Sequence, residues 1–392
     1  MMRIEPMCGM KIYYIANARM PTERAHGIQL AKMCEALLDA GADLELILPR
    51  RRTRSVSIRE FYGLRRDIPL RRLWTLDTYG FGRIGFYFGS ILFMISYKCF
   101  FLFKRMRGEQ FVIYTIDMDQ FSSALLPLLG IPYVAEIHDS KKHSFLYALL
   151  FKYARGIVVI NDSIKNELAA NFTGIDTNKI IVFPNGIDAA FFDTGLSKKE
   201  ARQKLGLPAD AKIVLYGGQF YQWKGFEIFP EAALRIGNGV IIAIVGADQY
   251  EVQAGIGVEN IPLNLMFFGK KPYIEMPLWF SAADALIVLG TKKNEYSYLH
   301  TSPMKLFEYM ASKRPVVAAN TPAIHQMADE PHVFFYTPDD ASDMVRAITK
   351  ALENSAEVEA KVERAFMKAA AFSWEKRGKI VLEYIEKIGS RK

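Results

Sequence analysis

The sequence has few cysteines and no motif that groups metal ligands. Its 392 residues include only Cys8, Cys34 and Cys99, and their spacing fits neither a disulfide framework nor a CxxC metal or redox site. This scarcity is typical of a chain that folds in a reducing compartment, so we expect a cytoplasmic protein. The first nine residues mix charged and apolar side chains, and we expect no signal peptide there.

The most aromatic part of the chain has too short an uncharged run to cross a bilayer. Residues 84–97 carry no charge, but these fourteen residues fall short of the roughly twenty that a spanning helix needs. Ten aromatic residues lie within 79–103, and the surrounding segment 50–107 holds fourteen Lys and Arg against three Asp and Glu. Because the whole chain has a net charge of only +8, the positive charge is concentrated in this segment.

A basic and aromatic segment that does not span a membrane can bind the surface of an anionic one. The alternative is a buried helix of the first domain, preceded by a solvated basic loop. Single-stranded nucleic acid also binds basic and aromatic side chains, but here the aromatics lie in an apolar run and most arginines precede it. We therefore expect an anionic membrane surface as a candidate partner and no nucleic acid.

The length and composition predict two globular domains. With 51% hydrophobic and 23% charged side chains over 392 residues, the chain exceeds what one core usually organises. In its first half, strands alternate with helical segments, which is typical of a parallel, doubly wound sheet. These strands are predicted at residues 11–16, 44–48, 111–116, 132–137, 156–160 and 179–183.

The second half repeats this alternation. Between the halves, Pro184-Asn-Gly-Ile-Asp188 is a turn signal, and a polar stretch without a clear strand follows it to about Pro208. We therefore predict an α/β fold of two Rossmann-like domains facing each other across a cleft, with boundaries at 1–190 and 191–372, and a last helix at 373–392. The strands of the second domain are predicted at residues 212–216, 240–245, 265–268, 285–289 and 315–319.

One stretch of the second domain has the features of a phosphate site. Ser302 is a good N-cap and Pro303 fits the first helical position, so we predict a helix that begins there, after a strand end. Its N-terminus would offer N–H donors to a phosphate, and Met304 and Lys305 lie in its first turn, where Lys305 adds a positive charge. Glu308 follows about one turn later, where its carboxylate could accept from sugar hydroxyls. The alternative is an ordinary capped helix.

A second candidate phosphate element follows the first strand of the same domain. The turn Gly217-Gly218 permits close approach of the backbone to a ligand, and Lys224 supplies a cation before the next helix. In the first domain, Gly27 opens the first helix, and His138 follows a strand at its carboxyl end. A His-Asp pair at a strand end can also be a polar loop without a role.

Five short segments form a recognisable set along the chain. Together they resemble the group 1, or family 4, glycosyltransferases of the GT-B fold, and the resemblance covers nearly the whole chain from Met10 onward. It implies a nucleotide-sugar donor bound by the C-terminal domain, an acceptor bound by the N-terminal domain, retention of anomeric configuration, and no cofactor or required metal. It also implies that the final helix crosses back onto the first domain. The segments are residues 25–29, 184–188, 217–225, 301–311 and 372–375.

The resemblance also implies roles for single residues. Lys224 matches the lysine that binds the donor diphosphate, and Glu308 matches the second Glu of the family's Glu-x7-Glu motif, a ribose ligand. His138 matches the donor-sugar histidine, and Gly27 lies in the glycine loop near the phosphates. The candidate catalytic residues are therefore His138, Lys224 and Glu308. No carboxylate nucleophile is identifiable, which favours a front-side displacement with the leaving phosphate as the base.

Two positions depart from the family pattern. The chain has His300 where the family usually has the first Glu of that motif, and Gln219 where an arginine commonly helps to hold the diphosphate. The missing arginine removes a bidentate phosphate contact and leaves more of the leaving-group charge to Lys224 and the helix start. His300 could still hydrogen-bond a sugar hydroxyl. The departures motivate an alternative, a degenerate member that binds sugar nucleotide or membrane as a partner protein.

Other enzyme classes are weaker alternatives. Asp117-Met-Asp119 has the Asp-x-Asp form with which a metal-dependent GT-A transferase holds a diphosphate, but a second complete Rossmann domain argues against that class. The sequence also leaves open a GT-B enzyme of another reaction, such as an epimerase or a phosphorylase. The sequence thus predicts a glycosyltransferase with a nucleotide-sugar donor and a carbohydrate or lipid-linked acceptor, acting in surface polysaccharide or glycolipid assembly at the inner face of the plasma membrane.

Overall fold

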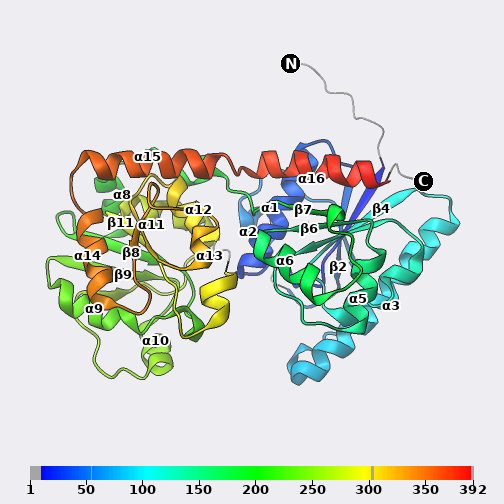
Figure 1. Cartoon of the computed structure of the whole chain (residues 1–392), viewed down its shortest axis with the longest axis horizontal. Coiled ribbons are helices and arrows are strands. Elements are labelled where there is room, and N and C mark those ends of the chain that lie inside the picture. The colour runs from blue at the N-terminus through cyan, green and yellow to red at the C-terminus, as the bar shows by residue number, and fades with distance from the viewer. Residues whose placement is uncertain (1–9, 54, 302–303, 390–392) are drawn as a thin grey trace, which may run out of the picture. The chain divides into compact units, whose positions relative to one another are not determined.

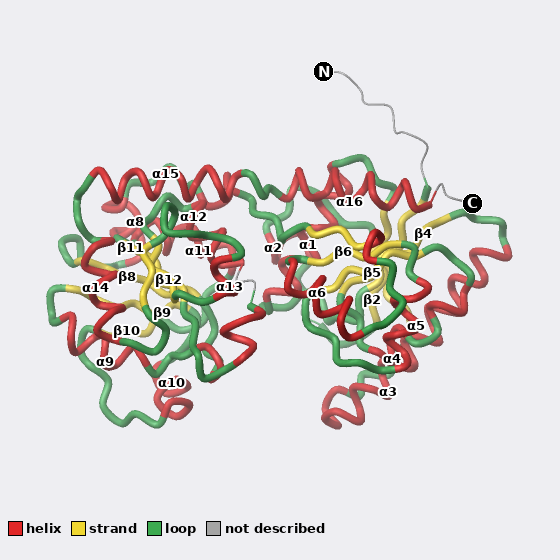
Figure 2. The backbone as a smooth tube through the Cα atoms, viewed as in Figure 1, coloured by secondary structure: helices red, strands yellow, loops and turns green. Residues whose placement is uncertain are grey.

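The computed structural model describes residues 10–53, 55–301 and 304–389. The chain divides into two compact units (Figure 1). Unit 1 comprises the chain up to Gly186 together with the C-terminal segment from Trp374, and unit 2 comprises Ile187–Ser373. Each unit is built on a parallel sheet with helices beside it (Figure 2).

Unit 1 contains a seven-stranded parallel sheet in the order β3-β2-β1-β4-β5-β6-β7. The strand order reverses between β1 and β4, the kind of position at which doubly wound sheets bind ligands. Every residue of β4 is buried, as expected for an uncharged run in a sheet covered on both faces. The strands are β1 (Lys11–Ile15), β2 (Leu44–Pro49), β3 (Leu70–Leu73), β4 (Phe111–Ile116), β5 (Tyr133–Ile137), β6 (Gly156–Val159) and β7 (Ile180–Val182).

The last helix of the chain packs on the first helix of unit 1. A Cβ on Gly378 of α16 would lie 2.6 Å from the carbonyl oxygen of Ala36 on α1, so this glycine permits the close contact between the two helices. The helices of unit 1 are α1 (Ala25–Asp39), α2 (Ile58–Tyr62), α3 (Gly82–Met106), α4 (Gln120–Ser123), α5 (Phe145–Tyr153), α6 (Asp162–Asn171) and α16 (Trp374–Gly389).

The aromatic segment forms one long helix, α3, of 25 residues. By length and composition α3 could cross a membrane, and it is the one such helix among the described residues. The length of the apolar helix estimated from the sequence was therefore too short, because the estimate counted only the uninterrupted uncharged run. One face of α3, with Phe93, Tyr97 and Phe101, belongs to the hydrophobic core of unit 1.

Much of the basic character of segment 50–107 is neutralised within unit 1. Several arginines that precede α3 pair with carboxylates, although their side chains stay exposed to solvent. The ion pairs are Arg59–Asp67, Arg65–Asp39, Arg66–Asp39 and Arg71–Glu45.

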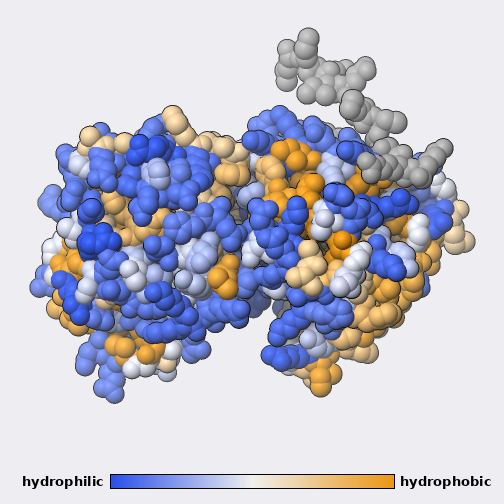
Figure 3. Space-filling model, viewed as in Figure 1, coloured by the Kyte–Doolittle hydropathy of each residue, from blue (hydrophilic) through white to orange (hydrophobic). Residues whose placement is uncertain are grey.

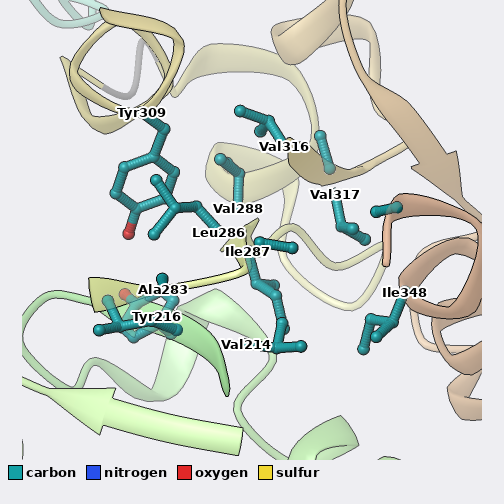
Figure 4. Packing of buried hydrophobic residues seen from close by; sticks show 14 of the residues in the cluster. Val214, Tyr216, Ala283, Leu286, Ile287, Val288, Tyr309, Val316, Val317 and Ile348 are labelled. Atoms are coloured by element: carbon teal, nitrogen blue, oxygen red, sulfur yellow. The ribbon is translucent and has the colours of Figure 1, made fainter. Parts of the chain in front are cut away.

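Unit 2 contains a six-stranded parallel sheet in the order β10-β9-β8-β11-β12-β13. Its core consists of the apolar strand residues and the inner faces of the helices, such as Val214, Leu286 and Ile348 (Figure 4). The strands are β8 (Lys212–Gly217), β9 (Val240–Val245), β10 (Leu265–Phe267), β11 (Ala285–Val288), β12 (Val316–Ala319) and β13 (Phe334–Tyr336). The helices are α7 (Ala189–Phe192), α8 (Lys198–Leu205), α9 (Ile228–Ile236), α10 (Gln249–Ile256), α11 (Met276–Ala282), α12 (Met304–Ala311), α13 (Pro322–His325), α14 (Ala341–Ala351) and α15 (Ala356–Ala370).

The eleven predicted strands are all confirmed, two of them with identical boundaries and the others within one residue at each end. The sequence analysis missed the edge strands β3 and β13. β3 is Leu-Arg-Arg-Leu, whose central charged pair hides the strand pattern, and β13 has only three residues. β3 pairs on one side only and is partly exposed, so burial constrains its sequence less than that of a central strand, whereas the three residues of β13 are all buried.

Candidate active site

Strand β8 ends in the turn Gly217-Gly218, which is held by two neighbouring elements. Tyr309 on α12 accepts from the Gly217 N–H at 2.8 Å and donates to the Gly217 carbonyl at 3.2 Å. The Gly218 N–H donates to the carbonyl of Val245 at 2.6 Å. A Cβ on Gly246 would lie 2.6 Å from the backbone of Gly218, so the ends of β8 and β9 approach each other at a distance that glycine permits.

Lys305, in the first turn of α12, lies against this turn. Its Nζ donates to Tyr216 Oη at 3.3 Å and lies 4.6 Å from the centre of the Tyr216 ring. A Cβ on Gly218 would lie 1.3 Å from Nζ, so the absence of a side chain at Gly218 makes room for the ammonium group. Burial lowers the pKa of Lys305 well below its usual value, and the positive charge of Lys224 lowers it further.

Lys224 is the second cation of the site. It ends the helical turn Gln222–Lys224, and its Nζ lies 4.6 Å from the ring centre of Tyr221 and 5.1 Å from that of Trp223. Burial lowers the pKa of Lys224 to about 8. In the described part of the chain, neither Lys224 nor Lys305 forms an ion pair with a carboxylate. Both ammonium groups are desolvated, and the charge of Lys224 acts on Lys305, so the pair makes a site suited to an anion.

Glu308 lies one turn after Lys305 on the same helix. Its side chain is buried, and its Oε1 accepts from Tyr273 Oη at 3.2 Å. Burial raises the pKa of Glu308 to about 7, although the nearby charge of Lys305 and the hydrogen bond from Tyr273 both oppose the rise. A buried carboxyl beside the charge of Lys305 can accept hydrogen bonds from the hydroxyl groups of a ligand.

The two residues that depart from the family pattern lie close to Lys224 in the sequence or in space. Gln219 follows the glycine turn, and its Oε1 accepts from Tyr221 Oη at 2.8 Å. His300 ends the π-helical turn Tyr296–His300, and that turn contacts the Lys224 segment through Tyr296, whose ring centre is 5.1 Å from that of Trp223.

Part of the predicted helix start cannot be compared with the structure. Ser302 and Pro303 lie outside the described residues. Met304 is the first described residue of α12, followed by Lys305. The predicted N-cap therefore stays a prediction, whereas the structure shows that Lys305 and Glu308 lie on one helix.

The predicted donor-sugar histidine belongs to a buried network in unit 1. His138 Nε2 contacts Glu136 Oε1 and lies 2.9 Å from Gln29 Nε2. Glu136 is fully buried at the end of β5, where Tyr114 donates to its Oε2 and Arg377 of α16 donates to its Oε1 at 2.5 Å. The His138 imidazole is thus oriented by an acid that Tyr114 and Arg377 hold in place.

Gly27 lies in the first turn of α1, where the backbone is crowded. A Cβ at this position would lie 2.3 Å from Tyr62 Oη and 2.5 Å from the methyl group of Thr22. The Tyr62 hydroxyl accepts from the Thr22 N–H and donates to the Thr22 carbonyl, both at 2.8 Å. Glycine at this position is therefore required for the packing of the loop before α1. This requirement does not depend on a ligand.

The Asp-x-Asp triplet does not form a metal site in this structure. Asp117 pairs with Lys141 at 2.6 Å and accepts from the His138 N–H. Asp119 is the N-cap of α4 and also accepts from Asn17 at 2.8 Å. No group of three or more His, Cys, Asp or Glu suited to a metal ion occurs among the residues that were described.

Residues 197–371, most of unit 2, match the family model of the glycosyl transferases group 1. This segment is a group 1 glycosyl transferase domain. The glycine turn, Lys224, Lys305 and Glu308 all lie inside this group 1 domain.

Comparison with curated proteins finds glycosyltransferases at low identity. D-inositol 3-phosphate glycosyltransferase 1 of Catenulispora acidiphila is 26% identical over 207 residues, which cover 48% of this chain and 47% of that protein. The chain thus spans about half the length of the curated relatives it matches.

Solved structures are similar over nearly the whole chain. A glycosyltransferase from Rickettsia africae has a TM-score of 0.76 at 16% identity, covering 98% of this chain and all of that one. Alr3699/HepE of Anabaena, crystallised with UDP and glucose, has a TM-score of 0.71 at 18% identity, covering 96% of this chain and all of that one. The fold is therefore the GT-B fold, as the sequence predicted.

Sequence reasoning missed several residues of these two clusters. Tyr216, Tyr273 and Tyr309 gave no signal, because a buried tyrosine in an apolar strand or helix has the pattern of a core residue. Glu136 and Arg377 are 241 positions apart, so no local pattern joins them. A charged residue inside an otherwise apolar strand, such as Glu136 in Tyr-Val-Ala-Glu-Ile, is the one signal that could have indicated a buried partner.

Proposed function

We propose that this protein is a retaining, metal-independent glycosyltransferase that moves a sugar from a nucleoside diphosphate sugar to a hydroxyl acceptor. The observation that carries the proposal is the pair of lysines, Lys224 and Lys305, next to the turn Gly217-Gly218. A diphosphate would bring negative charge to these two cations. The Glu308 carboxyl would accept hydrogen bonds from the ribose hydroxyls. The UDP in the Anabaena structure supports a donor of this chemical class.

The proposed reaction depends on stabilising the leaving group. As the bond between the anomeric carbon and the phosphate oxygen breaks, negative charge develops on the diphosphate, and the ammonium groups of Lys224 and Lys305 stabilise it. The acceptor oxygen forms its bond on the same face of the sugar, and its proton passes to the departing phosphate. Removal of one such donor in comparable sites costs about 3 kcal/mol of transition-state stabilisation.

Metal independence follows from the same arrangement in this proposal. The two lysines take the place that a divalent cation has in transferases that hold a diphosphate through carboxylates. The carboxylates of the one candidate triplet, Asp117 and Asp119, are engaged with Lys141 and with the start of α4.

We also propose that the protein acts in the cytoplasm on a carbohydrate or lipid-linked acceptor held by unit 1, in surface polysaccharide or glycolipid assembly. Cys34 and Cys99 are free thiols, which suits a reducing compartment. An acceptor at a membrane is supported by the exposed apolar face of α3.

The first test is calorimetric titration of the full chain with UDP, GDP and ADP, each with EDTA and with Mg²⁺. We expect one nucleotide to bind equally under both conditions, with binding weakened at least tenfold in Lys224→Ala. Lys350→Ala, an exposed lysine on α14 of the same unit, is the matched control and should bind like wild type.

Turnover is then measured with the matching sugar nucleotide, and NMR of the product gives its anomeric configuration. An inverted product would refute retention, and binding that requires Mg²⁺ would refute metal independence. Binding without turnover of any offered acceptor, together with vesicle binding, would favour the non-catalytic partner protein. Turnover that requires inorganic phosphate would favour a phosphorylase.

A further inference from the structure

One side of α3 carries a continuous apolar stripe that is exposed to solvent. Ile84 is 84% exposed, Phe88 49%, Ile95 46%, Leu102 39% and Met106 85%. At about 100° per residue, these five positions fall within a narrow sector along the whole length of the helix. Figure 3 shows hydrophobic residues along the lower right edge of the view, where Figure 1 places α3.

The opposite side of α3 is fixed to the protein. Phe93, Tyr97 and Phe101 are fully buried in the core of unit 1, and Tyr97 Oη donates to the Ser122 carbonyl at 2.6 Å. A helix that crosses a bilayer as a single element is surrounded by lipid, which this packing does not allow. In the folded unit, α3 can therefore present only one side to an apolar phase, and its axis must lie along the surface of that phase.

The charges on α3 all have one sign. The helix and the following Arg107 contain no Asp or Glu, and the guanidinium of Arg107 lies 4.9 Å from the ring centre of Phe103, which is 54% exposed. Lys104 pairs with Glu109, and Arg105 donates to the carbonyls of Leu129 and Gly130. Arg83, Lys98 and Arg107 are therefore the cations that can complement anionic lipid headgroups beside the stripe. The same face on a second copy would place like charges against each other, which disfavours a symmetric dimer. The basic residues are Arg83, Lys98, Lys104, Arg105 and Arg107.

We propose that α3 is an in-plane docking helix for an anionic membrane. Its stripe of Ile84, Phe88, Ile95, Leu102 and Met106 enters the boundary between headgroups and acyl chains, and the cations beside it contact the headgroups. With 25 residues at about 1.5 Å each, the helix offers a contact line of roughly 37 Å. This surface does not depend on the transfer reaction, so it can be tested without nucleotide or sugar.

The chain contains a native position for a probe of this contact. Cys99 is exposed and lies four residues after Ile95 and three before Leu102, on the same side of the helix. Cys34 is buried, so a Cys8→Ser variant leaves Cys99 as the accessible thiol for an environment-sensitive fluorophore.

The experiment measures sedimentation of the full chain with vesicles of phosphatidylcholine, alone or with 30% phosphatidylglycerol. We expect binding to the anionic vesicles only, weakened by salt, together with a blue shift of the Cys99 label. The double variant Phe88→Glu/Ile95→Glu should lose at least tenfold in binding. The control Leu263→Glu changes a residue of unit 2 that is 96% exposed and should bind like wild type.

Circular dichroism and thermal melting of both variants check that the substitutions leave the fold intact. Equal binding of wild type and the double variant would overturn the proposal, as would equal binding of wild type to neutral and anionic vesicles. A wild-type dimer in solution that the double variant dissociates, without vesicle binding by either, would assign the stripe to a second copy of the chain instead.

Discussion

Arg377 and Glu136 form a fully buried ion pair, with 2.5 Å between Nη2 and Oε1, although 241 positions separate them. The second guanidinium nitrogen, Nη1, donates to the carbonyls of Phe183 at 2.6 Å and Pro184 at 3.1 Å. Burial by itself would raise the pKa of Glu136, but the charges of Arg377 and His138 and their hydrogen bonds together outweigh this effect and hold that pKa below its usual value. The pair thus ties α16 to the end of β5, two residues before His138.

Replacing Arg377 with Met should destabilise unit 1 strongly. The substitution keeps most of the side-chain volume but leaves the Glu136 carboxylate buried without its charged partner, which in comparable cases costs about 3–5 kcal/mol. Thermal and urea unfolding of the full chain measure the effect. Lys379→Met on the same helix is the control, because Lys379 forms an exposed pair with Glu375 and should change stability by less than about 0.5 kcal/mol.

The stabilising effect of this pair should depend on pH in a defined direction. Because the folded-state pKa of Glu136 lies below its unfolded value, its contribution is present above the unfolded pKa and is lost as the pH falls through the folded one. The difference in melting temperature between wild type and Arg377→Met should therefore shrink on acidification below pH 4. A difference that is constant over pH 3–7 would contradict this account.

Replacing Gly27 with Ala should destabilise the start of α1. The new Cβ would lie 2.3 Å from Tyr62 Oη and would have to displace a hydroxyl that makes two hydrogen bonds to Thr22. Overpacking of this kind costs about 1–3 kcal/mol. The melting temperature is the measurement, and Gly239→Ala is the control because its Cβ would meet nothing within 4 Å. Equal melting temperatures for the two variants would refute the packing role of Gly27.

Nucleotide affinity should fall as the pH rises through the pKa of Lys224. In the free protein that pKa is lowered to about 8 by burial, and a diphosphate binds the protonated form. Above pH 8, affinity should therefore drop by up to about tenfold per pH unit for one required proton. Calorimetry between pH 7.5 and 9 in buffers of different ionisation enthalpy measures the drop and the linked proton uptake. In Lys224→Ala both should be smaller, and an equal pH dependence in the variant would exclude Lys224 as the group responsible.

The stability of the Glu308→Gln variant relative to wild type, both without ligand, should increase as the pH rises. The folded-state pKa of Glu308 is raised to about 7, so the folded state disfavours its ionised form, and stability falls as the pH rises from the unfolded pKa to the folded one. A shift of this size corresponds to about 3 kcal/mol. The melting temperature of Glu308→Gln minus that of wild type should increase between pH 5 and 8. The exposed Glu275→Gln serves as the control, and the same increase there would assign the effect to another group.

The sheets could be predicted because each central strand is a short apolar run between turn residues. The strands Phe111–Ile116 and Ala285–Val288 carry no charged residue. This is typical of a strand that is buried on both faces of a sheet. The edge strand β3 could not be predicted, because pairing on one side lets it carry two arginines. β13 is a buried Phe-Phe-Tyr run of the same length as the predicted edge strand β10, and it was overlooked. The candidate residues of the second domain were proposed on a similar basis, since glycine turns and helix starts have local sequence signals.

The sequence by itself determined the alternation of strands and helices in two α/β halves, because this depends on local patterns of burial and turns. It also predicted Gly217, Lys224 and Glu308 as site residues from local turn and helix-start signals. Only the tertiary structure decided that Lys305 lies against Gly218. It also decided that Arg377 holds Glu136 beside His138, and which side of α3 remains exposed. Those relationships depend on contacts between residues far apart in the chain, and such contacts leave no periodic trace in the sequence.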